Sequence, residues 1–82
     1  MNSDTIRITD SYDEDLCVLI SDIEGFRKKN PQHMSESKVF ELEIYTKNST
    51  CYEFTYHTKV ARDVVYEEAV KAFTESLKRH TN

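Results

Sequence analysis

The sequence predicts a small α+β domain with the element order β-α-β-β-α. Apolar residues recur with a helical period after residue 11 and again after residue 58, and they alternate with polar residues across a hairpin spanning 38–57. A short first strand is predicted where Ile6 and Ile8 alternate with polar neighbours. We expect a short, mostly antiparallel sheet, made of the hairpin and this strand, with two helices packed on one face.

A chain of 82 residues predicts a single domain, 1–82, with a small core. Such a chain buries only about 60% of the surface that its unfolded form exposes. Its stability is therefore expected to be marginal.

The first helix is predicted to begin near Ser11, because Ser11 and Glu14 have the spacing of a capping box. Acidic residues at its start and the cluster Arg27-Lys28-Lys29 at its end suit the helix dipole, and Pro31 disfavours its continuation. The alternative is a buried strand through Leu16–Ile20, because five consecutive apolar residues also suit a strand. The predicted helical stripe consists of Leu16, Leu19, Ile20, Ile23 and Phe26.

The hairpin has one apolar face, formed by alternate residues of its two strands. These apolar residues all have even numbers, so the numbers of two residues paired directly across the hairpin must have an even sum. A two-residue loop fails this condition, and two different three-residue loops satisfy it. One such loop places Glu43 opposite Glu53, a like-charge pair. The other ends on Thr50, whose branched side chain resists a left-handed backbone. Both registers remain open from the sequence. The apolar face consists of Phe40, Leu42, Ile44, Tyr52, Phe54 and Tyr56.

The second helix is the clearest element. Thr58 or Asp63 is expected to cap it, and Glu67 and Lys71 form a favourable pair one turn apart. Its predicted core stripe consists of Tyr66, Ala69, Val70, Phe73 and Leu77, widened by Val65.

The sequence predicts no metal site and no cofactor. Asp10, Asp13 and Asp15 resemble the start of a calcium loop, but the glycine that such a loop needs at its sixth position is missing. The cysteine and histidine residues include no closely spaced pair of zinc ligands. There is no glycine-rich phosphate loop, since Gly25 is the only glycine.

No catalytic arrangement is predicted either. Cys51 and His57 share one face of a strand, but six extended residues separate them by about 20 Å. A pairing of Cys17 with His33 or His57 stays open, and a thiol-dependent enzyme is therefore a remaining alternative. Without a signal peptide, we expect a cytoplasmic protein with reduced thiols that behave as small hydrophobic residues.

Charge and hydropathy limit the partners. The net charge is −4 and Arg27-Lys28-Lys29 is the one basic cluster, so the charge disfavours a nucleic acid as the partner. A nucleic-acid-binding regulator is kept as the alternative function. The longest apolar run, Leu16–Ile20, is far too short to cross a membrane.

The remaining candidate site is the outer face of the hairpin. We expect its carboxylates to bind a basic segment of another protein. Its candidate residues are Glu41, Glu43, Tyr45, Glu53 and His57. An apolar stripe left uncovered in so small a chain would also favour a homodimer. We expect a non-catalytic regulatory protein that acts by protein binding.

The amino-acid usage bears on the origin of the chain. Residues encoded by AT-rich codons (Phe, Tyr, Met, Ile, Asn and Lys) number 27, against nine for Gly, Ala, Arg and Pro. This bias is typical of an AT-rich genome. It favours an accessory protein of a phage or mobile element that inhibits or modulates a host factor or a lysis protein.

Overall fold

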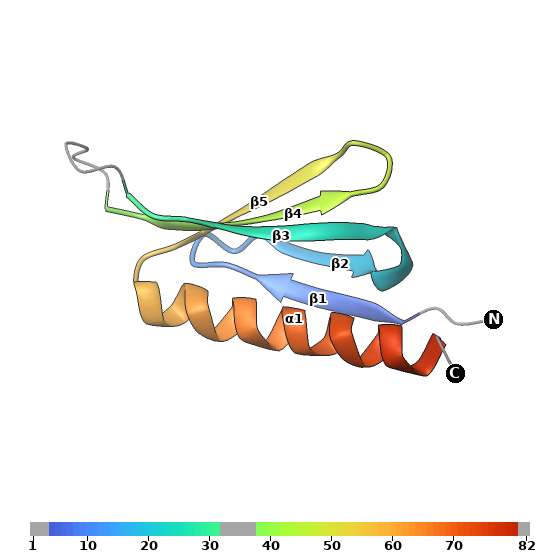
Figure 1. Cartoon of the computed structure of the whole chain (residues 1–82). Helices are drawn as coiled ribbons and strands as arrows, with labels where there is room; N and C mark the ends of the chain where they lie inside the picture. The colour runs from blue at the N-terminus through green and yellow to red at the C-terminus, as the bar shows by residue number, and fades with distance from the viewer. Residues whose placement is uncertain (1–3, 32–37, 81–82) are drawn as a thin grey trace.

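The computed structural model describes residues 4–31 and 38–80 (Figure 1). Within these residues, β1 and β2 form an antiparallel pair, and β3, β4 and β5 form an antiparallel three-stranded sheet with β4 in the middle. The helix α1 packs along one side of both sheets, in contact with β1 and with all three strands of the larger sheet (Figure 1). The elements are β1 (Thr5–Thr9), β2 (Asp15–Leu19), the 3-10 turn η1 (Ile20–Asp22), β3 (Ile23–Lys29), β4 (Phe40–Thr46), β5 (Cys51–Tyr56) and α1 (Lys59–His80).

The core lies between the two sheets and α1. Leu42 and Ile44 of the central strand are fully buried, and Ile8 of β1 is nearly so. The other buried apolar residues are Ile6, Val18, Ile20, Ile23, Phe54, Tyr56 and Ala69. Every element therefore contributes to the core.

The predicted order β-α-β-β-α is wrong, because the described residues form five strands followed by a single helix. The segment predicted as the first helix consists of β2, η1 and β3 instead. The alternative strand through Leu16–Ile20 agrees closely with β2, which buries Val18 while Cys17 and Leu19 remain exposed. The N-terminal strand is present as β1, but it pairs with β2 and not with the hairpin.

The apparent capping box is the turn that joins β1 to β2. The Asp10 carboxylate accepts hydrogen bonds from the backbone N–H groups of Tyr12 (2.9 Å) and Glu14 (3.0 Å). Asp13 adopts a left-handed conformation with φ 66°, which Asp tolerates better than most residues. Acidic residues cluster here because they stabilise a turn, which a helix N-terminus resembles in sequence.

The basic cluster that seemed to end a helix belongs to a strand. Arg27 and Lys29 on β3 lie directly opposite Glu43 and Glu41 on β4. Opposite charges facing each other across a strand pair stabilise a sheet. The same residues therefore satisfy two patterns, and cross-strand pairing is the one that the fold uses.

The hairpin is confirmed as β4 and β5, and its register is the one that places Glu43 opposite Glu53. The loop is Lys47–Ser49, and Ser49 takes the left-handed conformation with φ 68°. Ser49 has no branch at Cβ, whereas the other register would impose this conformation on Thr50. The like-charge pair is tolerated because Glu43 has cationic neighbours on β3.

Replacing Ser49 with glycine is expected to raise the free energy of unfolding by about 0.5–1 kcal/mol, because glycine adopts a positive φ without strain. Thr50→Gly should lower it, since Thr50 does not have a positive φ. Urea denaturation of both variants checks the register. Stabilisation by Thr50→Gly and not by Ser49→Gly would indicate the other loop.

The C-terminal helix is confirmed as α1, and Thr58 caps it by accepting a hydrogen bond from the Ala61 N–H group at 3.1 Å. The helix is rotated relative to the predicted stripe. The residues that it buries are Arg62, Ala69 and Ser76, whereas Leu77 is 49% exposed. One apolar flank of α1 therefore remains partly open to solvent.

Candidate functional site

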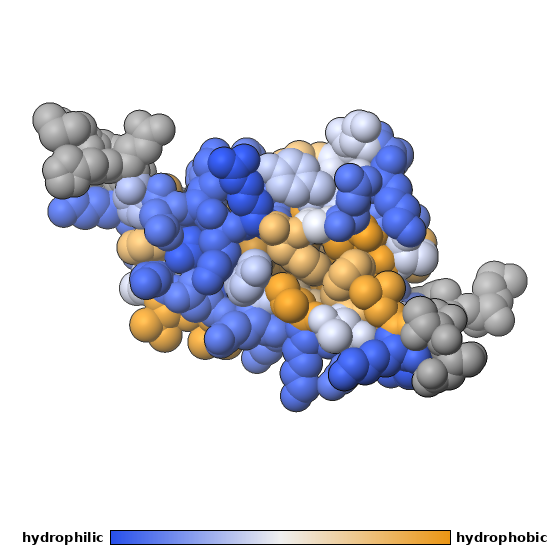
Figure 2. All heavy atoms as spheres, in the orientation of Figure 1, coloured by the Kyte–Doolittle hydropathy of each residue, from blue (hydrophilic) through white to orange (hydrophobic). Residues whose placement is uncertain are grey.

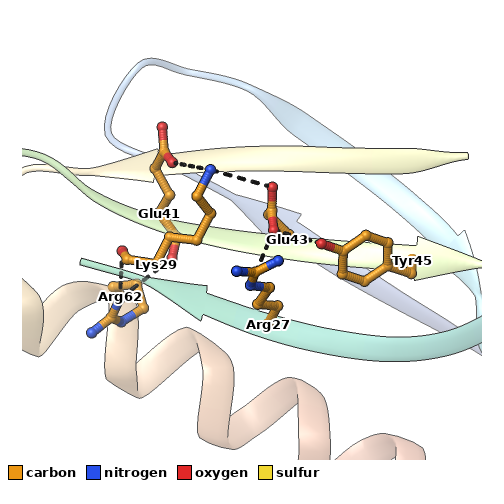
Figure 3. A network of polar contacts seen from close by, with 6 residues as sticks. All are labelled: Arg27, Lys29, Glu41, Glu43, Tyr45 and Arg62. Atoms are coloured by element: carbon orange, nitrogen blue, oxygen red, sulfur yellow. Dashed lines mark hydrogen bonds and ion pairs between the residues drawn. The ribbon is translucent and has the colours of Figure 1, made fainter. Parts of the chain in front are cut away.

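The outer face of the three-stranded sheet carries a network of charged side chains (Figure 3). Lys29 Nζ lies 3.6 Å from a carboxylate oxygen of Glu41 and 3.8 Å from one of Glu43. Arg27 Nε approaches Glu43 at 4.0 Å from the other side. The aromatic contacts of Phe26 with Tyr66 and Phe73 place α1 on the opposite face of the sheet.

Glu43 is the centre of this network and is only 5% exposed. The Tyr45 hydroxyl donates a 2.7 Å hydrogen bond to Glu43 Oε1. This bond is the main reason that the pKa of Glu43 is lowered; the positive charges of Lys29 and Arg27 lower it further, and burial opposes them. A buried carboxylate needs such partners to remain ionised. Glu43 therefore fixes the surrounding side chains.

Arg62 supports the same strands from the opposite side (Figure 3). Its Nη1 donates to the backbone oxygens of Lys29 (3.0 Å) and Glu41 (3.3 Å), and its Nη2 donates to Asn30 Oδ1 (2.9 Å). Its Nε lies 2.7 Å from Asp63 Oδ1, which lowers the pKa of Asp63. Arg62 thus anchors the ends of β3 and β4 to the start of α1.

Four of the five predicted site residues lie on this face. Glu41, Glu43 and Tyr45 are alternate residues of β4, and Glu53 faces Glu43 from β5. His57 does not join them, because it follows the end of β5 and its ring contacts Tyr12, with ring centroids 4.9 Å apart.

The network and its support also include residues that the sequence analysis did not assign to this site. The pattern of Arg27 and Lys29 fitted a helix end, and Arg62, which lies on the opposite side of the sheet, was given no role. Arg27 and Lys29 are two residues apart, as are Glu41 and Glu43. This shared spacing is the signal in the sequence that could have placed the cations opposite the carboxylates on paired strands. Arg62 left no signal, since a buried arginine within a helix resembles an exposed one in sequence.

The two thiols are free and lie at the surface, so they do not pack in the core as small hydrophobic residues. Partial burial and the neighbouring carboxylates of Glu43 and Glu53 raise the pKa of Cys51. A raised pKa keeps the thiol protonated at neutral pH, and the thiolate is the nucleophilic form. His33, the other histidine considered as a base for Cys17, lies outside the described residues.

A second surface feature, absent from the sequence predictions, is a groove of about 420 Å³ between the β2–β3 connection and the C-terminal half of α1. Ile20 and Ile23 line it from one side, and Phe73 and Leu77 line it from the helix. It exists because α1 presents Ser76, and not Leu77, to the core. The helix rotation is therefore the reason that the sequence did not reveal it.

Among the described residues, no group of three or more His, Cys, Asp or Glu is placed to hold a metal ion. The same part of the chain includes no helix with the length and apolar character needed to span a bilayer. Comparison with protein-family models, with curated proteins and with solved structures found no match for this chain.

Proposed function

We propose that this chain is a non-catalytic regulatory protein that acts in the cytoplasm by binding another protein with the outer sheet face. The observation that carries the proposal is the fixed network of Arg27, Lys29, Glu41, Glu43 and Tyr45 on the face opposite α1. Side chains already held in place lose less conformational entropy on binding than mobile ones. The face is thus suited to recognising a partner of matching charge pattern.

The charge layout specifies the chemistry of the partner. Arg27 has a side chain 65% exposed, and its ion pair with Glu43 is long. Glu53 is exposed, and no ion pair with another described residue engages it. A segment with a basic residue over Glu53 and an acidic residue over Arg27 fits this layout. The partner segment is therefore expected to carry an acidic residue next to the basic residue that the sequence analysis predicted.

The same charges favour a protein over a nucleic acid. Two cations, Arg27 and Lys29, stand among three carboxylates, Glu41, Glu43 and Glu53, which leaves an excess of one negative charge on the face. A phosphate backbone is attracted by accumulated lysine and arginine, and excess carboxylate repels it. The AT-rich amino-acid usage fits an origin in a phage or mobile element. We therefore propose an accessory protein that modulates a host factor or a lysis protein.

The test begins with affinity capture of the partner from the host and continues with binding kinetics of the purified pair. Glu53→Lys is expected to slow association about tenfold at low salt, because complementary charges mainly accelerate encounter. Added salt should reduce the difference between this variant and the parent. Glu67→Lys is the matched control: it makes the same charge change on an exposed position of α1 and should associate like the parent.

Tyr45→Ala distinguishes a binding face from a merely charged one. Aromatic side chains contribute a large share of binding energy at interfaces, so this variant should dissociate faster. Circular dichroism confirms that each variant is folded. If Glu53→Lys and Tyr45→Ala bind like Glu67→Lys, the outer sheet face does not contact the partner and the proposal is wrong.

A further inference from the structure

The groove beside α1 is an apolar surface that the outer sheet face does not use. Figure 2 shows an apolar area between β3 and the C-terminal half of α1, with hydrophilic residues around it. Ile20 and Ile23 are buried at its base, and the partly buried Phe73 and the half-exposed Leu77 form its helical side. Apolar patches of this kind on small proteins commonly mark interaction sites.

The border of the groove carries one residue of each charge that forms no ion pair within the described part of the chain. Glu24 and Lys47 both line it and are exposed. Neither side chain forms an ion pair with another residue of the described ranges 4–31 and 38–80. Asp4, which also lines the groove, differs because Arg79 and Ser76 already engage it. The border therefore offers an anion and a cation to an occupant.

From this arrangement we propose that the groove is the interface of a homodimer, in which a second copy of the chain packs its own groove against the first. A two-fold axis brings the same surface of both copies together, so any contact between two residues occurs twice. A border with one free anion and one free cation is self-complementary under this symmetry. Glu24 of each copy then meets Lys47 of the other, and Phe73 and Leu77 pack across the axis.

The contact is made by side chains and not by joining the two sheets. The free edge of β3 carries Arg27-Lys28-Lys29, and its ladder with β4 is interrupted by a bulge at Glu24. Basic residues and bulges at a sheet edge discourage the addition of another strand. A chain of 82 residues also benefits from burying this surface, because its own core is small.

The first test is the mass of the purified chain in solution, measured by sedimentation equilibrium over a range of concentrations. The parent is expected to approach twice 9.7 kDa as concentration rises. Leu77→Lys places a charge in the groove and should leave a folded monomer. Val60→Lys, at a position of α1 that is 74% exposed outside the groove, is the matched control and should dimerise like the parent.

The second test exchanges the charges. Glu24→Lys brings two lysines together at each border contact, and Lys47→Glu brings two glutamates together, so each variant alone should have a dimer dissociation constant raised about tenfold or more. When the two variants are mixed, a heterodimer can form in which Glu24→Lys supplies two lysines and Lys47→Glu supplies two glutamates. Both border contacts of this heterodimer then pair opposite charges, whereas both contacts of either homodimer pair like charges. The heterodimer should therefore form with an affinity near that of the parent, and circular dichroism of each variant verifies that it is folded.

Three results would overturn the dimer. They are a parent that stays monomeric at every concentration, a folded Leu77→Lys that still dimerises, and a mixture of the two charge variants that associates no better than either alone. The first of these results overturns the proposal even where a different protein binds to the groove of the monomer. Loss of dimerisation leaves the test of the outer sheet face unaffected, since the two surfaces share no residue.

Discussion

Replacing Arg62 with methionine is expected to destabilise the domain by about 3 kcal/mol, because it removes several part-buried hydrogen bonds of one buried side chain at once. Arg62 is 1% exposed and donates to two backbone oxygens and two side chains. Methionine keeps the apolar stem of the side chain and lacks only its polar end, so the loss reports mainly on the polar contacts of the guanidinium. Since small domains have only about 5–15 kcal/mol of stability, the change is large.

Urea denaturation followed by circular dichroism measures this effect. Arg62→Lys should also be strongly destabilising, because one ammonium group cannot reproduce the planar fork of the guanidinium. Arg7→Met is the control, since the Arg7 side chain is 68% exposed and pairs with Asp15 at the surface. A surface pair of this kind contributes little to stability. Equal denaturation midpoints for Arg62→Met and Arg7→Met would show that Arg62 is not buried among these acceptors.

The second large effect is expected at the centre of the three-stranded sheet. Leu42→Ala should lower the free energy of unfolding by about 2–5 kcal/mol, since it removes buried methyl groups and leaves a cavity. Leu42 is 0% exposed and lies on the middle strand, with Phe54 opposite it on β5. The side chains around it come from a close-packed core that cannot fully collapse into the space.

Leu19→Ala provides the matched comparison. The same atoms are removed, but Leu19 is 41% exposed on β2, so its loss should cost clearly less than that of Leu42. Thermal and urea unfolding of both variants, at a concentration too low for self-association, gives the difference. If the two variants lose the same stability, β4 is not the centre of the core.

The elements predicted correctly are those in which several local signals agree. In the hairpin, the alternation of apolar residues and the polar loop both indicate strands, and in α1 the cap at Thr58 and the helical period coincide. Between residues 11 and 29 the signals conflict. Acidic residues followed by a stripe and a basic end describe a helix, yet β-branched Val18, Ile20 and Ile23 suit strands. Pairing of β2 with β1, and of β3 with the distant strand β4, decides the outcome.

The site was predicted to a similar extent. Strand alternation places Glu41, Glu43 and Tyr45 on one face whatever the rest of the fold, and the register agrees with this placement; that the face binds a partner stays a prediction. The cations beside them could not be placed, because their position depends on β3, which was predicted as a helix. The burial of Glu43 and of Arg62 depends on contacts between distant segments, which a single sequence does not reveal.

The contact between the first strand and the last helix has a consequence for synthesis of the chain. Asp4 accepts a hydrogen bond from Ser76 and pairs with Arg79, and these residues are separated by 72 and 75 positions. Ile8 of β1 likewise belongs to the same core as Ala69 of α1. A nascent chain on the ribosome therefore exposes part of this core until α1 has left the exit tunnel. During that interval the apolar side of β1 is accessible to chaperones, and the core cannot be completed before α1 has been synthesised.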